Sequence, residues 1–245
     1  MKSRLDAALA ELGLAKSRTA AQVLIRSGCV TVNGKKAEKP SETVDPADDR
    51  IEVKDAETVL KYVGRGGFKL EHAIAEFGLS LSGLTCLDIG ASTGGFTDCM
   101  LQNGAKRVYA VDVGHDQLDG RLRDDPRVIS LEGLDIRHAD ESVIGERVDF
   151  IGIDVSFISL RLILPELARF AATGAEGVAL IKPQFEIGKK NVGKNGVIRD
   201  ERVHRRIVEE ICAFAGTIGL RELRVTPSPI TGGDGNREFL MAFRF

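Results

Sequence analysis

The sequence predicts an α/β protein made of two parts, a small α+β unit followed by a larger open sheet with helices. Two helical patterns and several short strands occupy the first 55 residues. From residue 84 the chain reads as a strand, a glycine-rich turn, a helix and a second strand, which is how a parallel sheet begins. Strand and helix patterns then alternate to the C-terminus, where a hairpin supplies an antiparallel last strand.

The composition is that of a globular protein and excludes several classes. Of the 245 residues 43% are hydrophobic, and no run approaches the ~18 apolar residues that span a bilayer. The N-terminus reads MKSRLDAALAELG, charged where a signal peptide needs an apolar stretch, so we expect a cytoplasmic protein with no membrane partner. The 4 cysteines show no C-x-x-C spacing, and no metal-ligand cluster appears, so we expect no metal.

Two short helices open the first unit. Apolar residues at helical spacing from Leu5 to Leu12 predict the first helix, with Ser3 and Asp6 as its capping box. A second helix is expected from Ser17 to Gly28, because a serine cap precedes the apolar stripe and a glycine follows it.

A small sheet follows the helices. The dipeptide Asn33-Gly34 after two valines predicts a hairpin, and residues 50–53 predict a later strand. The acidic stretch SETVDPADDR is interpreted as an exposed connection between strands. We therefore expect a first domain of residues 1–59, a linker of residues 60–63 and a second domain of residues 64–245.

The first 40 residues are locally basic, with lysines and arginines at helix starts and at the hairpin tip, where phosphates can reach them. Solvated charge on helix surfaces is the alternative. The elements R-x-D-x-x-L, S-R-x-x-A, I-x-x-G and V-x-V-N-G occur in this order, and the segment resembles the S4 RNA-binding domain. The resemblance implies binding to structured RNA by shape and phosphate contacts. The expected RNA-binding residues of this unit are Arg4, Lys16, Arg18, Arg26, Lys35 and Lys36.

The second unit begins with a strand, a glycine-rich turn and a helix in LTCLDIGASTGGFTD. A dinucleotide site would read G-x-G-x-x-G. Instead Asp88 precedes the first glycine in the pattern D-x-G-x-x-x-G-G, which resembles the loop that binds S-adenosylmethionine (SAM). A carboxylate at the strand end can receive the amino group of SAM, and Asp112 at the next strand tip can hold ribose hydroxyls. The expected cofactor residues are Asp88, Gly90, Ala91, Ser92, Thr93, Gly94, Gly95, Phe96 and Asp112, with Asp135 at the adenine edge.

Ionisable residues recur where ligands bind in open α/β sheets, beyond the carboxyl ends of the parallel strands. Predicted strands end at Asp88, Asp112, Asp154 and Lys182. Glu238 joins them, because an antiparallel last strand begins at the edge where its parallel neighbours end. A single polar residue at a strand end is common in any protein, whereas five at one edge indicate a site.

Lys69 lies beside the apolar stripe of the helix that opens the second unit, in GRGGFKLEHA. The simple interpretation is a surface lysine that lays its stem along the core and keeps its ammonium in water. A helix leading into the first strand would instead aim Lys69 at the carboxyl edge of the sheet. Together with Asp154, Lys182 and Glu238 it matches the Lys-Asp-Lys-Glu tetrad of the FtsJ-like RNA ribose 2′-O-methyltransferases.

With its S4-like unit the chain resembles the TlyA family, cytidine 2′-O-methyltransferases of ribosomal RNA that also carry the name haemolysin. LDIGASTGGFTD, IDVSFISL, IKPQFE and GGDGNREF carry the resemblance, and Ala91-Ser92-Thr93 replaces the proline-containing loop of the wider FtsJ group, as is typical of TlyA. It implies a Rossmann-like, seven-stranded class I methyltransferase domain, SAM as cofactor and ribosomal RNA or subunits as partner. Large subunit, small subunit or both remain open as the target, and so does the oligomeric state.

The resemblance also implies roles in methyl transfer. Lys182 contacts the ribose 2′-oxygen, as a proton acceptor if neutral or as a stabiliser of the developing oxyanion if charged. Asp154 and Glu238 fix its position, and Lys69 completes the network. The sequence leaves the two roles of Lys182 open.

Three further residues are expected to meet RNA. Arg65, in the hinge-like LKYVGRGG, touches RNA or orients the domains. Phe157 stacks on a base or on adenine, unless it belongs to the core, and Lys189 lies in a basic, glycine-interrupted stretch that suits a lid gripping the RNA backbone. The competing interpretations are a non-catalytic RNA-binding ribosome-assembly factor, a membrane-active haemolysin and a nucleotide-dependent dehydrogenase.

Overall fold

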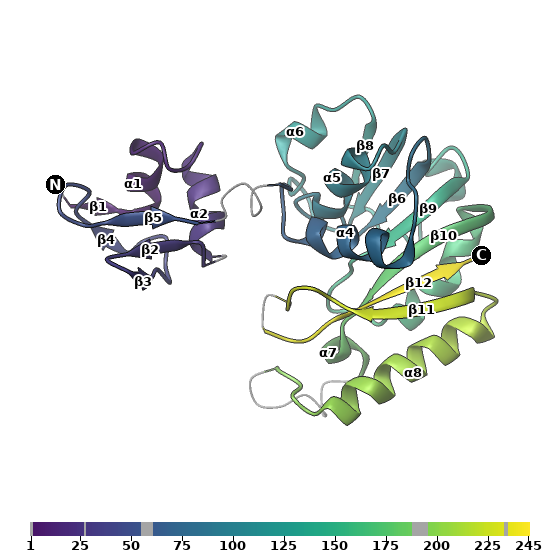
Figure 1. Ribbon diagram of the computed structural model, residues 1–245. Helices are drawn as coiled ribbons and strands as arrows, with labels where there is room; N and C mark the ends of the chain where they lie inside the picture. The colour runs from purple at the N-terminus through teal and green to yellow at the C-terminus, as the bar shows by residue number, and fades with distance from the viewer. Residues whose placement is uncertain (1, 27, 55–60, 188–195, 233–234) are drawn as a thin grey trace. The chain divides into compact units, whose positions relative to one another are not determined.

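The structure is a computed structural model that describes residues 2–26, 28–54, 61–187, 196–232 and 235–245. The chain forms two compact units, Met1–Tyr62 and Val63–Phe245 (Figure 1). Lys189 and the lid expected around it lie outside the described residues, as do residues 55–60 near the predicted domain boundary.

Helices and short antiparallel strands enclose one apolar core in the first unit. Asn33 and Gly34 have φ values of 51° and 75°, the left-handed pair that a tight hairpin requires, and β2 pairs with β3 and β5. Ser17 caps α2 by accepting a hydrogen bond from the N–H of Ala20, as expected. The elements are β1 (Ser3–Arg4), α1 (Leu5–Glu11), α2 (Arg18–Arg26), β2 (Val30–Val32), β3 (Lys35–Lys36), β4 (Thr43–Val44) and β5 (Ile51–Val53).

Two local predictions for this unit are wrong. Ser3 does not cap α1, because the cap residue is Arg4 and its side chain makes no capping bond. The stretch SETVDPADDR is more than an exposed connection, since Thr43–Val44 forms β4 and pairs with β1, and Val44 is buried. Both follow from β1, a two-residue strand too short to leave a periodic signal in the sequence.

Asp6, predicted as half of the capping box, is instead a buried acceptor shared by two helices. Arg4 donates to its carboxylate through Nε and Nη2, each at 3.0 Å, and Gln22 donates at 2.9 Å. Arg18 of α2 lies 3.4 Å away. The hydrogen bonds from Arg4 hold the pKa of Asp6 below its ordinary value, so its stabilising effect is present at neutral pH and is lost as the pH falls through the lowered pKa.

The described residues of the second unit form a seven-stranded sheet in the order β11-β12-β10-β9-β6-β7-β8. The central strands are parallel, whereas β12 runs antiparallel to β10 and β11, as predicted for the last strand. The strands are β6 (Thr85–Ile89), β7 (Arg107–Asp112), β8 (Val128–Glu132), β9 (Val148–Ile153), β10 (Ala171–Ile181), β11 (Arg221–Pro227) and β12 (Phe239–Arg244). The helices are α4 (Gly66–Phe77), α5 (Gly95–Gln102), α6 (Gly120–Arg123), α7 (Pro183–Glu186) and α8 (Glu201–Thr217), with 3-10 turns η1 (Glu141–Val143), η2 (Leu160–Leu162) and η3 (Leu164–Arg169).

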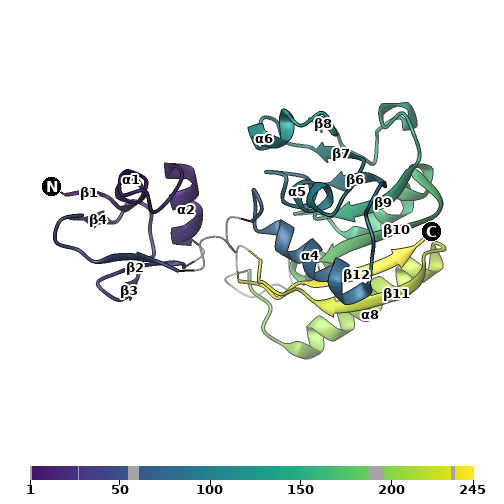
Figure 2. The same ribbon diagram turned by 45° about the horizontal axis from the view of Figure 1, so that its top comes forward.

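Helices cover both faces of this sheet (Figures 1 and 2). On one face α4 packs beside α5, and Gly152 of β9 makes room there, because a Cβ at this position would come within 2.5 Å of Met100. The neighbouring residues Ile151 and Ile153 point to the opposite face, where they share a core with Ile211 of α8. Alternate residues of β9 therefore pack against the helices on opposite faces of the sheet.

We expect Asp6→Ala to destabilise the first unit by about 1–3 kcal/mol, because three side chains lose their common buried acceptor. Hydrogen exchange of the α1 and α2 amides in the full chain measures this as lost protection. Asp48→Ala, which removes an exposed carboxylate, serves as the control and should change it by less than about 0.5 kcal/mol. Equal protection in wild type and Asp6→Ala would contradict the expectation.

Candidate active site

Four ionisable side chains from four elements meet at the carboxyl edge of the sheet. Lys69 lies near the start of α4, Asp154 directly follows β9, and Lys182 directly follows β10. Glu238 directly precedes β12, which runs antiparallel to β10 and therefore begins where β10 ends. The sheet topology thus brings the four predicted tetrad positions to one place.

The four side chains form a chain of alternating charge. Lys182 Nζ lies 2.6 Å from Asp154 Oδ1, and Lys69 Nζ lies 3.7 Å from Asp154 Oδ2 and 2.7 Å from Glu238 Oε2. Lys69 is 7% exposed and Glu238 4% exposed, so the interpretation of Lys69 as a solvated surface lysine is wrong. Two cations against two carboxylates leave the cluster without net charge, which is the condition under which such groups stay buried.

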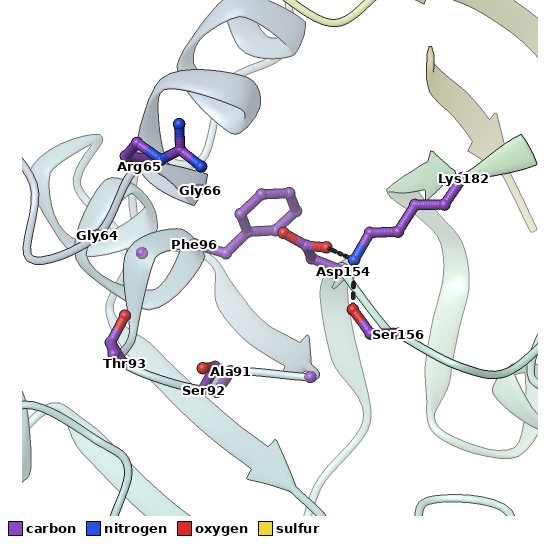
Figure 3. Close-up of a pocket in the computed structure, with 12 residues that line it drawn as sticks. Gly64, Arg65, Gly66, Ala91, Ser92, Thr93, Phe96, Asp154, Ser156 and Lys182 are labelled. Carbon is purple, nitrogen blue, oxygen red and sulfur yellow. Dashed lines mark hydrogen bonds and ion pairs between the residues drawn. The ribbon is translucent and has the colours of Figure 1, made fainter. Parts of the chain in front are cut away.

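Ser156 is a member of this cluster that the sequence analysis missed. Its hydroxyl accepts a hydrogen bond from Lys182 Nζ at 2.8 Å, beside the contact of Lys182 with Asp154 (Figure 3). The signal was present in the motif IDVSF, where Ser156 stands two residues after Asp154. With Asp154 and Ser156 as neighbours, the ammonium of Lys182 has two of its three donor directions assigned.

A cavity of about 200 Å³ opens beside the tetrad, between the start of α4 and the glycine-rich loop (Figure 3). Gly90 must lack a side chain, because a Cβ there would lie 2.6 Å from the carbonyl oxygen of Asp154. Gly95 is equally constrained, since its Cβ would lie 2.9 Å from the N–H nitrogen of Gly67. The predicted residues that line this cavity are Arg65, Gly90, Ala91, Ser92, Thr93, Gly95, Phe96, Asp154 and Lys182.

A second cavity, of about 780 Å³, adjoins the first and shares Gly90, Ser92, Asp154 and Ser156 with it. Asp112 and Asp135, two of the expected cofactor residues, line it. The Asp112 carboxylate accepts hydrogen bonds from the N–H of Ser92 at 2.8 Å and of Gly114 at 2.7 Å, so it holds the glycine-rich loop to the end of β7. A volume of this size suits a nucleoside-sized ligand.

Two expected cofactor residues do not reach either cavity. Asp88 is fully buried, with its Oδ2 accepting a hydrogen bond from the Thr97 hydroxyl at 2.6 Å and its Oδ1 without a partner. Burial raises the pKa of Asp88 to about 7. Gly94 is covered by Leu122, whose methyl group would lie 2.2 Å from a Cβ at this position. Both residues therefore support the glycine-rich loop from the core side and line neither cavity.

Phe157 lies at the rim of the larger cavity with its ring in solvent. It is 88% exposed, so the interpretation as a core residue is wrong, and its ring packs 5.0 Å from that of Phe185. Its φ of 65° is a left-handed conformation that bulky residues rarely adopt. An exposed aromatic ring on a strained backbone beside ionisable groups is a feature of functional sites.

Those basic residues expected to meet RNA that the structure describes are surface residues. Arg4 and Arg18 keep 50% and 58% of their side chains exposed although both lie against Asp6. Arg65 is exposed and borders the smaller cavity of the second unit. The remaining basic residues of the first unit are likewise exposed, namely Lys16, Arg26, Lys35 and Lys36.

The described residues contain neither a cluster suited to a metal ion nor a helix suited to span a membrane. Among them no three or more histidine, cysteine, aspartate or glutamate side chains are grouped so as to hold a metal ion. None of the helices formed by these residues combines the length and apolar character needed to cross a membrane.

The sheet order and the glycine-rich loop above the parallel strands define the fold of a class I methyltransferase. The N-methyltransferase NodS of Bradyrhizobium japonicum, solved in complex with S-adenosyl-L-homocysteine, has this fold at 17% identity, with a TM-score of 0.51 over 74% of this chain and 86% of its own. The chain belongs to the FtsJ-like methyltransferase family, which matches residues 62–245, and an S4 domain matches residues 3–51. The predicted fold class and resemblance are confirmed.

Relatives extend over nearly the whole chain. The 16S/23S rRNA (cytidine-2′-O)-methyltransferase TlyA of Mycobacterium tuberculosis is 42% identical over 99% of this chain and 90% of its own length. YqxC of Bacillus subtilis, provisionally named an rRNA methyltransferase, is 47% identical over 98% of this chain and 85% of its own. A solved structure from Streptococcus thermophilus, provisionally named a hemolysin, is 45% identical with a TM-score of 0.78, covering 99% and 88% of the two chains.

The raised pKa of Asp88 predicts a pH-dependent cost of folding. Because the folded protein keeps the Asp88 proton up to about pH 7 while the unfolded chain loses it near its ordinary pKa of 3.8, this group lowers stability as the pH rises between these values. Asp88→Asn removes that dependence. We expect the free energy of unfolding of the variant, relative to wild type, to increase by up to about 4 kcal/mol from pH 4 to pH 8.

Urea unfolding at a series of pH values measures this difference. The control is Asp124→Asn, which neutralises an exposed carboxylate. Its free energy of unfolding relative to wild type should not change with pH. A flat difference for Asp88→Asn as well would mean that Asp88 is ionised in the folded protein at neutral pH.

Proposed function

We propose that this protein transfers a methyl group from SAM to the 2′-hydroxyl of a cytidine ribose in ribosomal RNA. The target is expected in the large subunit, with the small subunit as a second substrate. The observation that carries the proposal is the ion-paired tetrad of Lys69, Asp154, Lys182 and Glu238 beside a cavity of nucleoside size. The name and the extent of the Mycobacterium tuberculosis relative support the choice of ribosomal RNA and of cytidine.

The two cavities fit SAM by their shape and chemistry. Gly90 lets the loop pack directly against the backbone of Asp154, where any side chain would collide. Asp112 and Asp135 offer carboxylate acceptors along the larger cavity, for the ribose and the adenine edge respectively. When bound, SAM supplies an electrophilic methyl group on a sulfonium ion. The smaller cavity, between Thr93 and the tetrad, would hold its amino-acid end and bring the methyl group towards Lys182.

The residues of the tetrad would act on the nucleophile. The 2′-oxygen forms a bond to the methyl carbon, the carbon–sulfur bond breaks with its electron pair passing to sulfur, and the 2′-proton must leave. A neutral Lys182 amine would accept that proton, whereas a charged one would stabilise the developing oxyanion while the proton passes to solvent. Asp154 and Ser156 would hold Lys182 in line, and Lys69 with Glu238 would hold Asp154.

RNA would be held at both units. The exposed basic residues of the first unit would contact the phosphate backbone, as would Arg65 at the mouth of the smaller cavity. The target nucleotide must leave its helix, because a paired strand would shield its 2′-hydroxyl from the cleft. The exposed ring of Phe157 offers a stacking surface for a base beside the tetrad.

Lys182→Ala should abolish methyl transfer while cofactor binding survives, because it removes the group that would contact the 2′-oxygen. Lys182 borders the smaller cavity but not the larger one, which would hold the adenosine. Purified protein is incubated with radiolabelled SAM and, separately, with large subunits, small subunits and protein-free RNA, and the label is located by blocked alkaline cleavage. Lys106→Ala, an exposed lysine outside both cavities, is the control and should retain full activity. Normal turnover in Lys182→Ala would contradict the assignment.

If no substrate is labelled by the wild-type protein although it binds the cofactor and RNA, the chain is a non-catalytic RNA-binding factor. A third variant separates the two roles of Lys182. Lys182→Arg keeps a positive charge but cannot accept a proton. If Lys182→Arg retains more methyl transfer than the alanine variant, the result supports oxyanion stabilisation. If Lys182→Arg transfers no more than the alanine variant, the result supports the proton-acceptor role.

Phe157→Ala should lower kcat/KM for RNA roughly tenfold, since base stacking on an aromatic ring contributes about 1–3 kcal/mol. The affinity for S-adenosylhomocysteine, measured by calorimetry, should stay unchanged. Phe157→Tyr preserves the stacking surface and is the matched control. Loss of S-adenosylhomocysteine affinity in the alanine variant would instead assign the ring to the adenine of the cofactor.

A further inference from the structure

One wall of the larger cavity is an irregular segment, residues 134–139, between β8 and η1. Leu134, Asp135, Ile136 and Arg137 all line the cavity. The segment belongs to no strand or helix, so no ladder of hydrogen bonds holds its backbone carbonyls. Its position must be set by other contacts.

Besides the hydrogen bond from the N–H of Leu134 to the carbonyl oxygen of Asp112, three of these contacts come from Arg169, which lies behind the wall. Its Nη1 donates to the carbonyl oxygen of Ala139 at 2.7 Å, and its Nη2 donates to the carbonyl oxygens of Ile136 at 2.7 Å and Arg137 at 3.0 Å. One planar guanidinium thus holds three carbonyl groups of a six-residue segment. A lysine could not reproduce this, because its ammonium is a single compact donor group.

The guanidinium is itself held rigidly. Arg169 is the last residue of η3, and its Nε donates to the carbonyl oxygen of Glu166 at 3.2 Å. Its guanidinium carbon lies 4.7 Å from the centre of the Phe170 ring, and Phe170 is buried. The guanidinium of Arg169 therefore has a fixed direction relative to the core that β9 and η3 share.

Arg169 lines neither cavity, so it would not touch a ligand in them. It acts through the backbone. A peptide unit is planar, so fixing the carbonyls of Ile136 and Arg137 also fixes the directions of the N–H groups that follow them. Asp135, the carboxylate expected at the adenine edge, is held on the wall by the N–H and the guanidinium of Arg137, whose own carbonyl group Arg169 holds.

We propose that Arg169 is a positioning residue for the adenosine end of the cofactor, acting through the three carbonyl groups of residues 136, 137 and 139. This inference rests on the proposed function, because it takes the larger cavity as the SAM site. It assigns to Arg169 a share of the affinity for SAM and none of the chemistry at the 2′-oxygen.

Arg169→Lys tests this, with Arg224→Lys as a matched control. Arg224 also donates to a backbone carbonyl, that of Phe77 at 2.7 Å, and also packs on an aromatic ring, 5.1 Å from the centre of Phe77, but it lines neither cavity and touches no residue of the wall. Calorimetry with S-adenosylhomocysteine should give a Kd about tenfold higher for Arg169→Lys and an unchanged Kd for Arg224→Lys. In turnover the KM for SAM should rise while kcat at saturating SAM stays within twofold of wild type.

Hydrogen exchange shows whether the wall is the cause. Amides of residues 134–139 should exchange faster in Arg169→Lys, with the protection of β9 and β10 retained. The inference is overturned if the wild type binds S-adenosylhomocysteine and Arg169→Lys binds it equally well, or if both lysine variants lose affinity in proportion to lost stability. If the wild type itself binds no S-adenosylhomocysteine, the proposed function fails first and this inference with it.

Discussion

Two lysines and two carboxylates share one poorly solvated edge of the sheet, and the burial of each depends on the others. An isolated charge in such a place would cost several kcal/mol, whereas alternating charges within about 4 Å offset that cost. Lys69 lies between Asp154 and Glu238, and Lys182 lies against Asp154. This network joins α4, at the start of the second unit, to β12 at its end, so the cluster forms only when β9, β10 and β12 have assembled beside α4.

The cleft is tied to that network through the backbone. Gly90 approaches the carbonyl of Asp154 so closely that no side chain fits between the glycine-rich loop and the tetrad. Gly95 approaches the start of α4 in the same way, which places the helix that carries Lys69 against the loop. Cofactor loop and tetrad are therefore one packed structure, and a change in either would move the other. In the proposed reaction this packing would bring the methyl donor and the 2′-oxygen together.

The first unit uses the same principle for a different purpose. Asp6 is buried because Arg4, Arg18 and Gln22 surround its carboxylate. The two arginines keep about half of their side chains in solvent, so one buried acid orients two basic groups on the surface. Pairing through Nε and Nη2 leaves the Nη1 side of Arg4 directed away from Asp6. A preorganised guanidinium loses less freedom on meeting a phosphate than a mobile one does.

The sequence alone determined the fold class, the glycine-rich loop and the four tetrad positions. These follow from local rules, because strand ends, glycine turns and the direction of the last strand are written in short stretches of sequence. Tertiary structure decided what depends on contacts between distant segments. The burial of Asp88 beneath the loop, the exposure of Phe157 and the contact of Ser156 with Lys182 belong to this class. The same holds for Asp6, which is a shared acceptor instead of a helix cap, and for the three carbonyl contacts of Arg169. A periodic sequence pattern does not indicate which side chain contacts which distant group in the fold.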